Sequence, residues 1–306
     1  MILPIAHVGG GVFEPLQLVP PFAALAAYAL RARTLAREGR PVPPVRIVCF
    51  AFGVALVIAA LTTPVAHIGG ELVLAHMAQH LLMADLGALF LVLGLTGPLL
   101  QPLLATRLAH SLRVLAHPIV AFVLWAVDLY VWHLPALYEA AVASAPVHAL
   151  QHTTFVFFGV TMWFALLGPL PQPEWFGNGA KLLYIVAVRL TGALLGNIFL
   201  WAETVFYPVY RPGQASWDLT PLEDQGIAGT IMMLEGSIVT VVLLGWLFLK
   251  TARAALCSLS SSPCSLAYST SLWRSSDSRA VFRNSQPSRT TVTMLPSSIM
   301  IVPAIP

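Results

Sequence analysis

Seven long apolar runs constrain the fold of this chain more than any other feature of its sequence. The core of a bilayer offers the backbone no hydrogen-bonding partner, so an apolar run of about 20 residues must satisfy its own N–H and C=O groups by forming a helix. The sequence therefore predicts an all-α fold, a polytopic membrane helix bundle with about seven transmembrane helices. The runs are Leu16–Leu30, Ile47–Val65, Leu72–Leu95, Pro118–Leu134, Ala149–Leu167, Leu182–Trp201 and Ile227–Leu249.

Composition excludes two broad classes of protein. Of the 306 residues, 58% are hydrophobic and only 9% are charged, which is unlike a soluble domain. The formal net charge of +3 is spread between the apolar runs, so the chain has no basic patch of the kind that binds nucleic acid. The three cysteines show neither metal-binding nor redox spacing. The expected partner of most of the surface is the lipid bilayer.

The distribution of basic residues predicts the orientation, because short loops rich in Lys and Arg stay in the cytoplasm. The loops on one side of the membrane together hold one basic residue, Arg211, and several acidic residues. We therefore expect the N-terminus outside and the C-terminus in the cytoplasm. The other loops and the exit of the last run hold Arg31, Arg33, Arg37, Arg40, Arg46, Arg107, Arg113, Lys181, Lys250 and Arg253.

The two ends of the chain differ from the bundle between them. Residues 1–16 lack the basic start and small-residue cleavage site of a signal peptide, so the first helix is expected to remain in the mature protein. Residues 1–253 are assigned to a transmembrane domain. Residues 254–306 are rich in Ser and Thr and lack a helical period, which predicts a disordered tail or an aberrant reading frame.

The predicted topology places the nine histidines unevenly. His110 and His117 fall on the inner side, and the other seven fall at the outer face. A single histidine at an interface is usually an amphipathic residue with a solvated ring. This simple explanation suits His7, His67 and His133 when each is taken alone. The outer seven are His7, His67, His76, His80, His133, His148 and His152.

Two histidine pairs are harder to explain by packing. His76 and His80 are four residues apart, as are His148 and His152, and on a helix this spacing puts both rings on one face. Polar groups at membrane depth are costly and usually functional, so we expect at least one pair to bind a metal or haem. Continuing the first stripe reaches Met83, and imidazole with thioether suits Cu(I).

Charged residues inside the runs form a second set. Asp85 and Arg189 lie at similar depth in their predicted helices, so they are expected to form a buried ion pair. Such a pair can fix helix packing or mark a proton or ion path. Asp128 and Glu235 are candidates for orienting a metal-binding imidazole by a hydrogen bond to its other ring nitrogen, or for lining a polar cavity.

Three segments resemble the signature regions of the seven-helix CtaG family, assembly factors of caa-type cytochrome c oxidase. They are HMAQHLLM, WHLPALYEAAV followed by HALQH, and LTPLEDQGIAGTIM. The resemblance covers roughly residues 16–249 and implies a noncatalytic role in the bacterial inner membrane, in maturing the oxidase copper centre. The implied partner is the oxidase subunit that carries this centre. The positions that match are His76, His80, His133, His148 and His152, with Asp224 and Gln225 as the family's DQ pair; Glu235 stands where the family suggests Trp or Pro.

Three functions remain open at this point. The leading hypothesis is an assembly factor that holds Cu(I) at the outer face and passes it to the oxidase. A copper transporter or resistance protein would use the same histidines and a polar route through Asp85, Asp128 or Arg189. A b-type haem protein would need axial histidines from two helices, for which His80 and His152 are the available pair.

Overall fold

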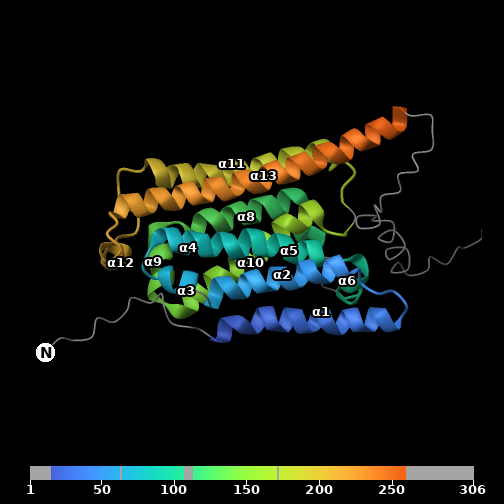
Figure 1. Ribbon diagram of the computed structural model, residues 1–306, viewed down its shortest axis with the longest axis horizontal. Coiled ribbons are helices and arrows are strands. Elements are labelled where there is room, and N and C mark those ends of the chain that lie inside the picture. Colours follow the sequence, from blue (N-terminus) through green and yellow to red (C-terminus); the bar gives the residue numbers. More distant parts are fainter. Residues whose placement is uncertain (1–14, 63, 107–112, 171, 260–306) are drawn as a thin grey trace, which may run out of the picture.

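The computed structural model describes residues 15–62, 64–106, 113–170 and 172–259, and every regular element in these ranges is helical (Figure 1). The long helices run along one axis of an elongated bundle (Figure 1). Helix α11 packs on α13, α13 on α4, α10 on α8 and α5, and α2 on α5. The all-α prediction is confirmed.

Helices occur at all seven apolar runs, interrupted by short connecting elements. The long ones are α1 (Val19–Arg37), α2 (Pro44–Thr62), α8 (Pro118–Trp132), α10 (Ala145–Leu167), α11 (Asn178–Trp201) and α13 (Pro221–Leu259). The third run contains α4 (Val73–His80), η2 (Leu81–Gly87) and α5 (Ala88–Gly94). The short elements are η1 (Pro15–Leu18), α3 (Pro64–Ile68), α6 (Gly97–Leu104), α9 (Pro135–Ala143), η3 (Pro208–Tyr210) and α12 (Arg211–Ser216).

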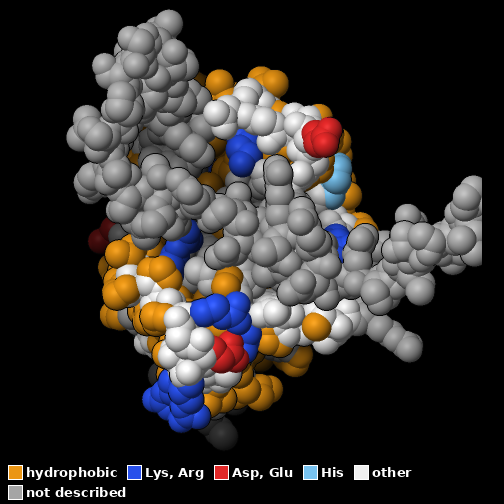
Figure 2. All heavy atoms as spheres, turned by 90° about the vertical axis from the view of Figure 1, so that its right-hand side faces the viewer, with side chains coloured by type: hydrophobic (Ala, Val, Ile, Leu, Met, Phe, Trp, Pro, Cys, Tyr) orange, Lys and Arg blue, Asp and Glu red, His pale blue; other side chains and the backbone are white. Residues whose placement is uncertain are grey.

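Within the described residues, four helical segments are long and apolar enough to cross a membrane, or five if the bent pair α8 and α9 counts as one span. The four are α2, the third run from Val73 to Gly94, α10 and α11. Membrane crossing by α1 and α13 stays a prediction, as does the orientation of the termini. Lys and Arg side chains lie at the end of the bundle where α1 passes into α2 (Figure 2), and the sequence there includes the exposed Arg37 and Arg40.

The fourth run bends at its C-terminal end. Helix α8 ends at Trp132, and α9 begins at Pro135 with its axis turned by 73°. Leu134 adopts an extended backbone with φ of −64° and ψ of 129°, because the ring of a following proline disfavours the helical conformation. The bend places His133, the C-cap of α8, at the junction of the two helices.

The third run is not a continuous α-helix. After His80 the backbone forms a π-helix over seven residues, Leu81–Gly87, and then returns to α. Segments of π-helix are rare and are frequent at functional sites. This one begins directly after the two histidines of α4 and contains both Met83 and Asp85.

Helices α11 and α13 approach closely at two glycines. A Cβ added to Gly229 of α13 would collide with the carbonyl oxygen of Gly196 of α11. Small residues let membrane helices approach at backbone distance. At its far end α13 continues past the predicted domain boundary at residue 253 to Leu259, and residues 260–306 lie outside the described part of the chain.

Candidate metal centre

Helices α4 and α10 both begin at the end of the bundle opposite the α1–α2 connection (Figure 1). Two histidines of each helix converge there. The ring centroids of His76 and His80 are 4.3 Å apart, and those of His148 and His152 are 4.0 Å apart. Across the two helices, the rings of His76 and His148 lie at 5.3 Å and those of His80 and His152 at 5.4 Å. The two pairs therefore form a single cluster.

Three of these residues can offer ring nitrogens to a common point. His76, His80 and His148 each have a ligand nitrogen within 4.8 Å of the others. Metal–nitrogen bonds of about 2.0 Å put ligand nitrogens about 3.3–3.5 Å apart, so closure around an ion requires side-chain movements on the order of 1 Å. We call these three residues, His76, His80 and His148, the three-histidine site.

The cluster leaves buried ring nitrogens without hydrogen-bond partners among the described residues. These are Nε2 of His76, His148 and His152 and both ring nitrogens of His80. Buried polar atoms are nearly always satisfied, and an unsatisfied group points to a bound ion or water. The donor set consists of neutral imidazoles, which suits copper or zinc better than hard cations. A soft or borderline metal therefore fits this site.

The hydrogen bonds on the other ring nitrogens fix which nitrogen is free. Nδ1 of His76 lies 3.2 Å from the carbonyl oxygen of Gly69, and Nδ1 of His152 lies 3.0 Å from Oε1 of Gln17. Both oxygens accept, so in each neutral ring Nδ1 carries the proton and Nε2 carries the lone pair. Metal-binding histidines are typically held this way by a carbonyl or carboxylate behind the ring.

Two buried tyrosines extend this support around His76. The hydroxyl of Tyr210 is 3.1 Å from Nδ1 of His76 and 3.1 Å from the hydroxyl of Tyr138. Burial raises the pKa of Tyr210, and nearby Asp224 raises it further. The hydroxyl therefore stays neutral and hydrogen-bonds the imidazole without placing a phenolate beside it.

Asp224 and Gln225, the pair before the last run, hold backbone rather than imidazoles. Asp224 is fully buried, and its carboxylate accepts hydrogen bonds from the N–H groups of Val73 and Leu74, the first residues of α4. The Nε2 of Gln214 donates to the same carboxylate at 2.8 Å. Gln225 accepts from the backbone N–H of Phe206 at 2.9 Å. These residues position α4 and the loop that follows α11.

His133 lies beside the cluster rather than in the three-histidine site. Its Nδ1 is 2.6 Å from the carbonyl oxygen of Leu129, and its Nε2 is 3.3 Å from Sδ of Met77. The hydroxyl of Tyr207 donates to the carbonyl oxygen of His133 at 2.8 Å, which holds the α8–α9 bend. Met83, the methionine of the predicted ligand stripe, lies instead in an apolar cluster with Val57 and Ala60, because the π-helix interrupts the α-helical spacing.

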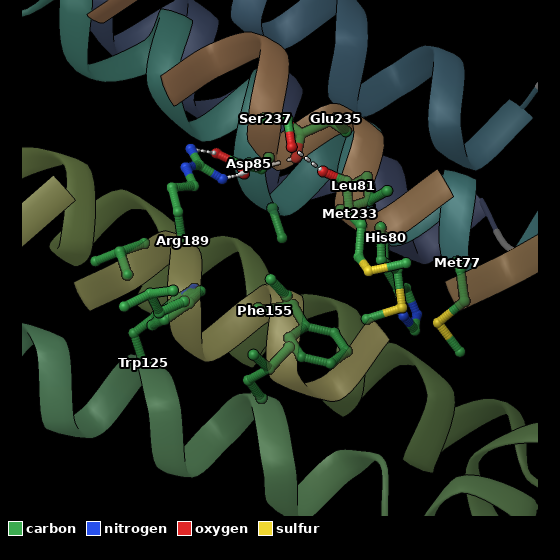
Figure 3. Close-up of a pocket in the computed structure, with 18 of the residues that line it drawn as sticks. Met77, His80, Leu81, Asp85, Trp125, Phe155, Arg189, Met233, Glu235 and Ser237 are labelled. Carbon is green, nitrogen blue, oxygen red and sulfur yellow. Dashed lines mark hydrogen bonds and ion pairs between the residues drawn. The ribbon is translucent and has the colours of Figure 1, made fainter. Parts of the chain in front are cut away.

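A cavity of about 410 Å³ lies behind the histidines (Figure 3). Met77, His80 and His133 line one part of it, and Asp85, Arg189 and Glu235 line another. Its other walls are mainly apolar, with Phe155 and Trp125 among them (Figure 3). Asp128 does not line this cavity; its carboxylate interacts with Thr154 and Trp132 and not with a histidine of the cluster.

The charged end of the cavity is a group of three residues. Arg189 binds Asp85 through two hydrogen bonds, Nη1 to Oδ2 at 2.5 Å and Nη2 to Oδ1 at 3.2 Å. Glu235 lies 3.7 Å from Nη1 of the same guanidinium, and the indole N–H of Trp163 donates to Asp85 at 2.9 Å. Glu235 therefore accompanies an ion pair, and the sequence-based suggestion that it orients an imidazole has no counterpart in these contacts.

Sequence reasoning missed Met77, Tyr210 and Gln17. Met77 stands between the paired histidines, but a methionine inside an apolar run is typical of a packed core. Tyr210 and Gln17 lie 134 and 135 residues from the histidines they contact, and no local pattern marks them.

The chain is similar to known proteins over most of its length. The family model described as cytochrome c oxidase caa3 assembly factor (Caa3_CtaG) matches residues 26–254. Uncharacterized proteins of Mycobacterium bovis and Mycobacterium tuberculosis are each 26% identical over 224 residues, which cover 67% of this chain and 33% of theirs. One from Mycobacterium leprae is 23% identical over 236 residues, covering 71% and 36%. The chain thus spans about a third of the length of these curated relatives. No solved structure matches it.

Proposed function

Because the chain belongs to the family of cytochrome c oxidase caa3 assembly factors, we propose that it binds Cu(I) as cargo at the outer membrane face and supplies it to the copper-bearing oxidase subunit. His76, His80 and His148 would hold the ion, with His152 as an alternative ligand. The single observation that carries this proposal is the cluster of buried imidazole nitrogens that have no partner in the described structure. No bond-making chemistry beyond ligand exchange is required.

The support is chemical as well as positional. Neutral imidazoles bind Cu(I) without adding charge, so a monovalent ion leaves the buried site with a single positive charge. The cluster lies at the end of α4 and α10 rather than at mid-bundle, which is where a partner could exchange ligands with the metal.

The alternatives from the sequence have weaker support. Axial ligation of haem by His80 and His152 would place a macrocycle between them, yet these rings are 5.4 Å apart and the His76 ring is 4.3 Å from that of His80. A transporter would need a continuous polar route, but Asp128 is set apart from the Asp85–Arg189 pair, and the cavity walls between the histidines and that pair are mainly apolar.

The test compares His76→Ala/His80→Ala with His67→Ala, an exposed histidine on the neighbouring helix α3. Purified proteins are titrated with Cu(I) against a chromogenic chelator, and oxidase copper content is measured in membranes of complemented cells. We expect the double variant to bind less Cu(I) than the parent and to lose oxidase copper, while keeping its helical circular dichroism. The proposal fails if the double variant matches the parent in both assays.

A further inference from the structure

The contact between Met77 and His133 brings two hydrogen-bond acceptors together. Nδ1 of His133 faces the carbonyl oxygen of Leu129 at 2.6 Å. A carbonyl oxygen can only accept, so Nδ1 carries the single proton of the neutral ring. Nε2 therefore presents a lone pair to Sδ of Met77, which is itself an acceptor, at 3.3 Å. Two acceptors face each other in a buried place with no hydrogen between them.

A soft cation resolves this arrangement. Bonds of about 2.0 Å to nitrogen and about 2.3 Å to sulfur put two ligand atoms about 3.5 Å apart on one metal, close to the observed separation. Thioether and imidazole together are ligands for Cu(I). Met77 is 1% exposed and His133 8% exposed, so neither atom can turn to bulk water without moving its helix.

We propose that Met77 and His133 form a second Cu(I) position, separate from the three-histidine site and reached from it through His80. This inference rests on the proposed function and deepens it. His80 borders both places, because its ring packs on His76 and it also lines the cavity beside Met77 and His133. Met77 and His80 are three residues apart on α4, so they share a face of that helix.

Transfer between the two positions is a ligand exchange that balances without a co-reactant. Bonds from copper to Nε2 of His76, to His148 and finally to His80 break, and bonds to Sδ of Met77 and Nε2 of His133 form. Copper stays in the +1 state throughout. No proton moves at His76 or His133, because their protons stay on Nδ1, where the carbonyl oxygens of Gly69 and Leu129 hold them. The second position opens on the cavity of about 410 Å³ (Figure 3).

The test uses the full-length protein in detergent, with Cu(I) alone as the probe. Met77→Leu removes the sulfur at nearly constant volume. Met83→Leu is the matched control, because Met83 is equally buried on the same run and lies in a separate apolar cluster. We expect two Cu(I) per chain in the parent and in Met83→Leu, and one in Met77→Leu. The copper X-ray absorption spectrum should show a sulfur neighbour that only Met77→Leu loses.

His76→Ala separates this inference from the proposed function. It should lose the three-histidine site and keep one Cu(I) with a sulfur neighbour. A parent that binds one Cu(I) with nitrogen neighbours only, unchanged by Met77→Leu, overturns the second position and leaves the proposed function standing. A parent that binds no Cu(I) overturns both. The parent spectrum alone decides the matter if Met77→Leu fails to fold.

Discussion

The carboxylate of Asp224 caps a helix other than its own, accepting the backbone N–H of Val73 at 2.8 Å. Helix α4 begins after Leu72, which supplies no side-chain cap, so its first N–H groups depend on this distant residue. A carboxylate at a helix N-terminus also interacts favourably with the helix dipole. Helix α4, which carries His76 and His80, is thus held at its N-terminus by a residue of α13.

Asp224→Asn should destabilise the protein and loosen the histidine site. The amide keeps one acceptor oxygen and cannot serve both N–H groups of α4, and a lost hydrogen bond to a buried charged group costs about 1.5–3 kcal/mol. Glu223→Gln is the control, because Glu223 is exposed and binds only Thr220 of its own turn. Thermal unfolding in detergent should show a lower midpoint for Asp224→Asn alone; equal shifts in both variants would contradict the capping role.

Tyr210→Phe should weaken Cu(I) binding without unfolding the site. The hydroxyl contacts Nδ1 of His76, and loss of a group that supports a metal ligand from behind typically reduces affinity 10- to 100-fold; we expect about tenfold. Tyr207→Phe is the matched change, since its hydroxyl bonds the backbone carbonyl of His133. Chelator competition should separate the two, and an unchanged affinity in Tyr210→Phe would show that the hydroxyl has no influence on the ligand.

Arg189→Gln should be more damaging than Asp85→Asn. Without the guanidinium, the carboxylates of Asp85 and Glu235 lie near each other in a mostly buried place with no positive charge between them. In Asp85→Asn, by contrast, Arg189 still has Glu235 at 3.7 Å as a partner. Removing one partner of a buried pair costs about 3–5 kcal/mol, and we expect Arg189→Gln to reach this range. The double variant should recover part of the loss. Additive losses in a thermal double-mutant cycle would show that Asp85 and Arg189 are not coupled.

Gly229→Ala should disrupt the contact between α11 and α13. Its methyl group would meet the Gly196 carbonyl oxygen, and overpacking of this kind costs about 1–3 kcal/mol. Gly226→Ala, one turn earlier on α13, is the control because its Cβ would only touch a side-chain carbon of Leu200 at 3.7 Å. That variant should be neutral or slightly stabilised, since alanine favours helix. If Gly226→Ala destabilised the protein and Gly229→Ala did not, the close contact between α11 and α13 would not lie at Gly229.

The helices were predictable because their signal is local. An apolar run such as Ala149–Leu167 is long enough to specify a helix by itself, and α10 covers it fully. The bend at Leu134 and the π-helix after His80 were not foreseen. The first depends on the proline at 135, a cue that is readable in the sequence. The second leaves no mark in the spacing of apolar residues.

The site was partly predictable for the same reason. Four-residue spacing put each histidine pair on one helix face, and the structure brings the two pairs together. Spacing alone could not show that Met77 rather than Met83 approaches a histidine, because that choice depends on where the α-helix ends. The role of Asp224 was invisible as well, since its hydrogen bonds join residues 150 and 151 positions apart.

The π-helix also sets the angular relation between the two ends of the cavity. In an α-helix each residue turns by about 100°, so residues five apart point about 140° away from each other. In a helix bonded from i to i+5, five residues approach a full turn. His80 and Asp85 are five apart and line the same cavity; His80 directly precedes η2 and Asp85 lies within it. Rewinding this segment as α would swing Asp85 toward the opposite side, away from the cavity wall and from Arg189.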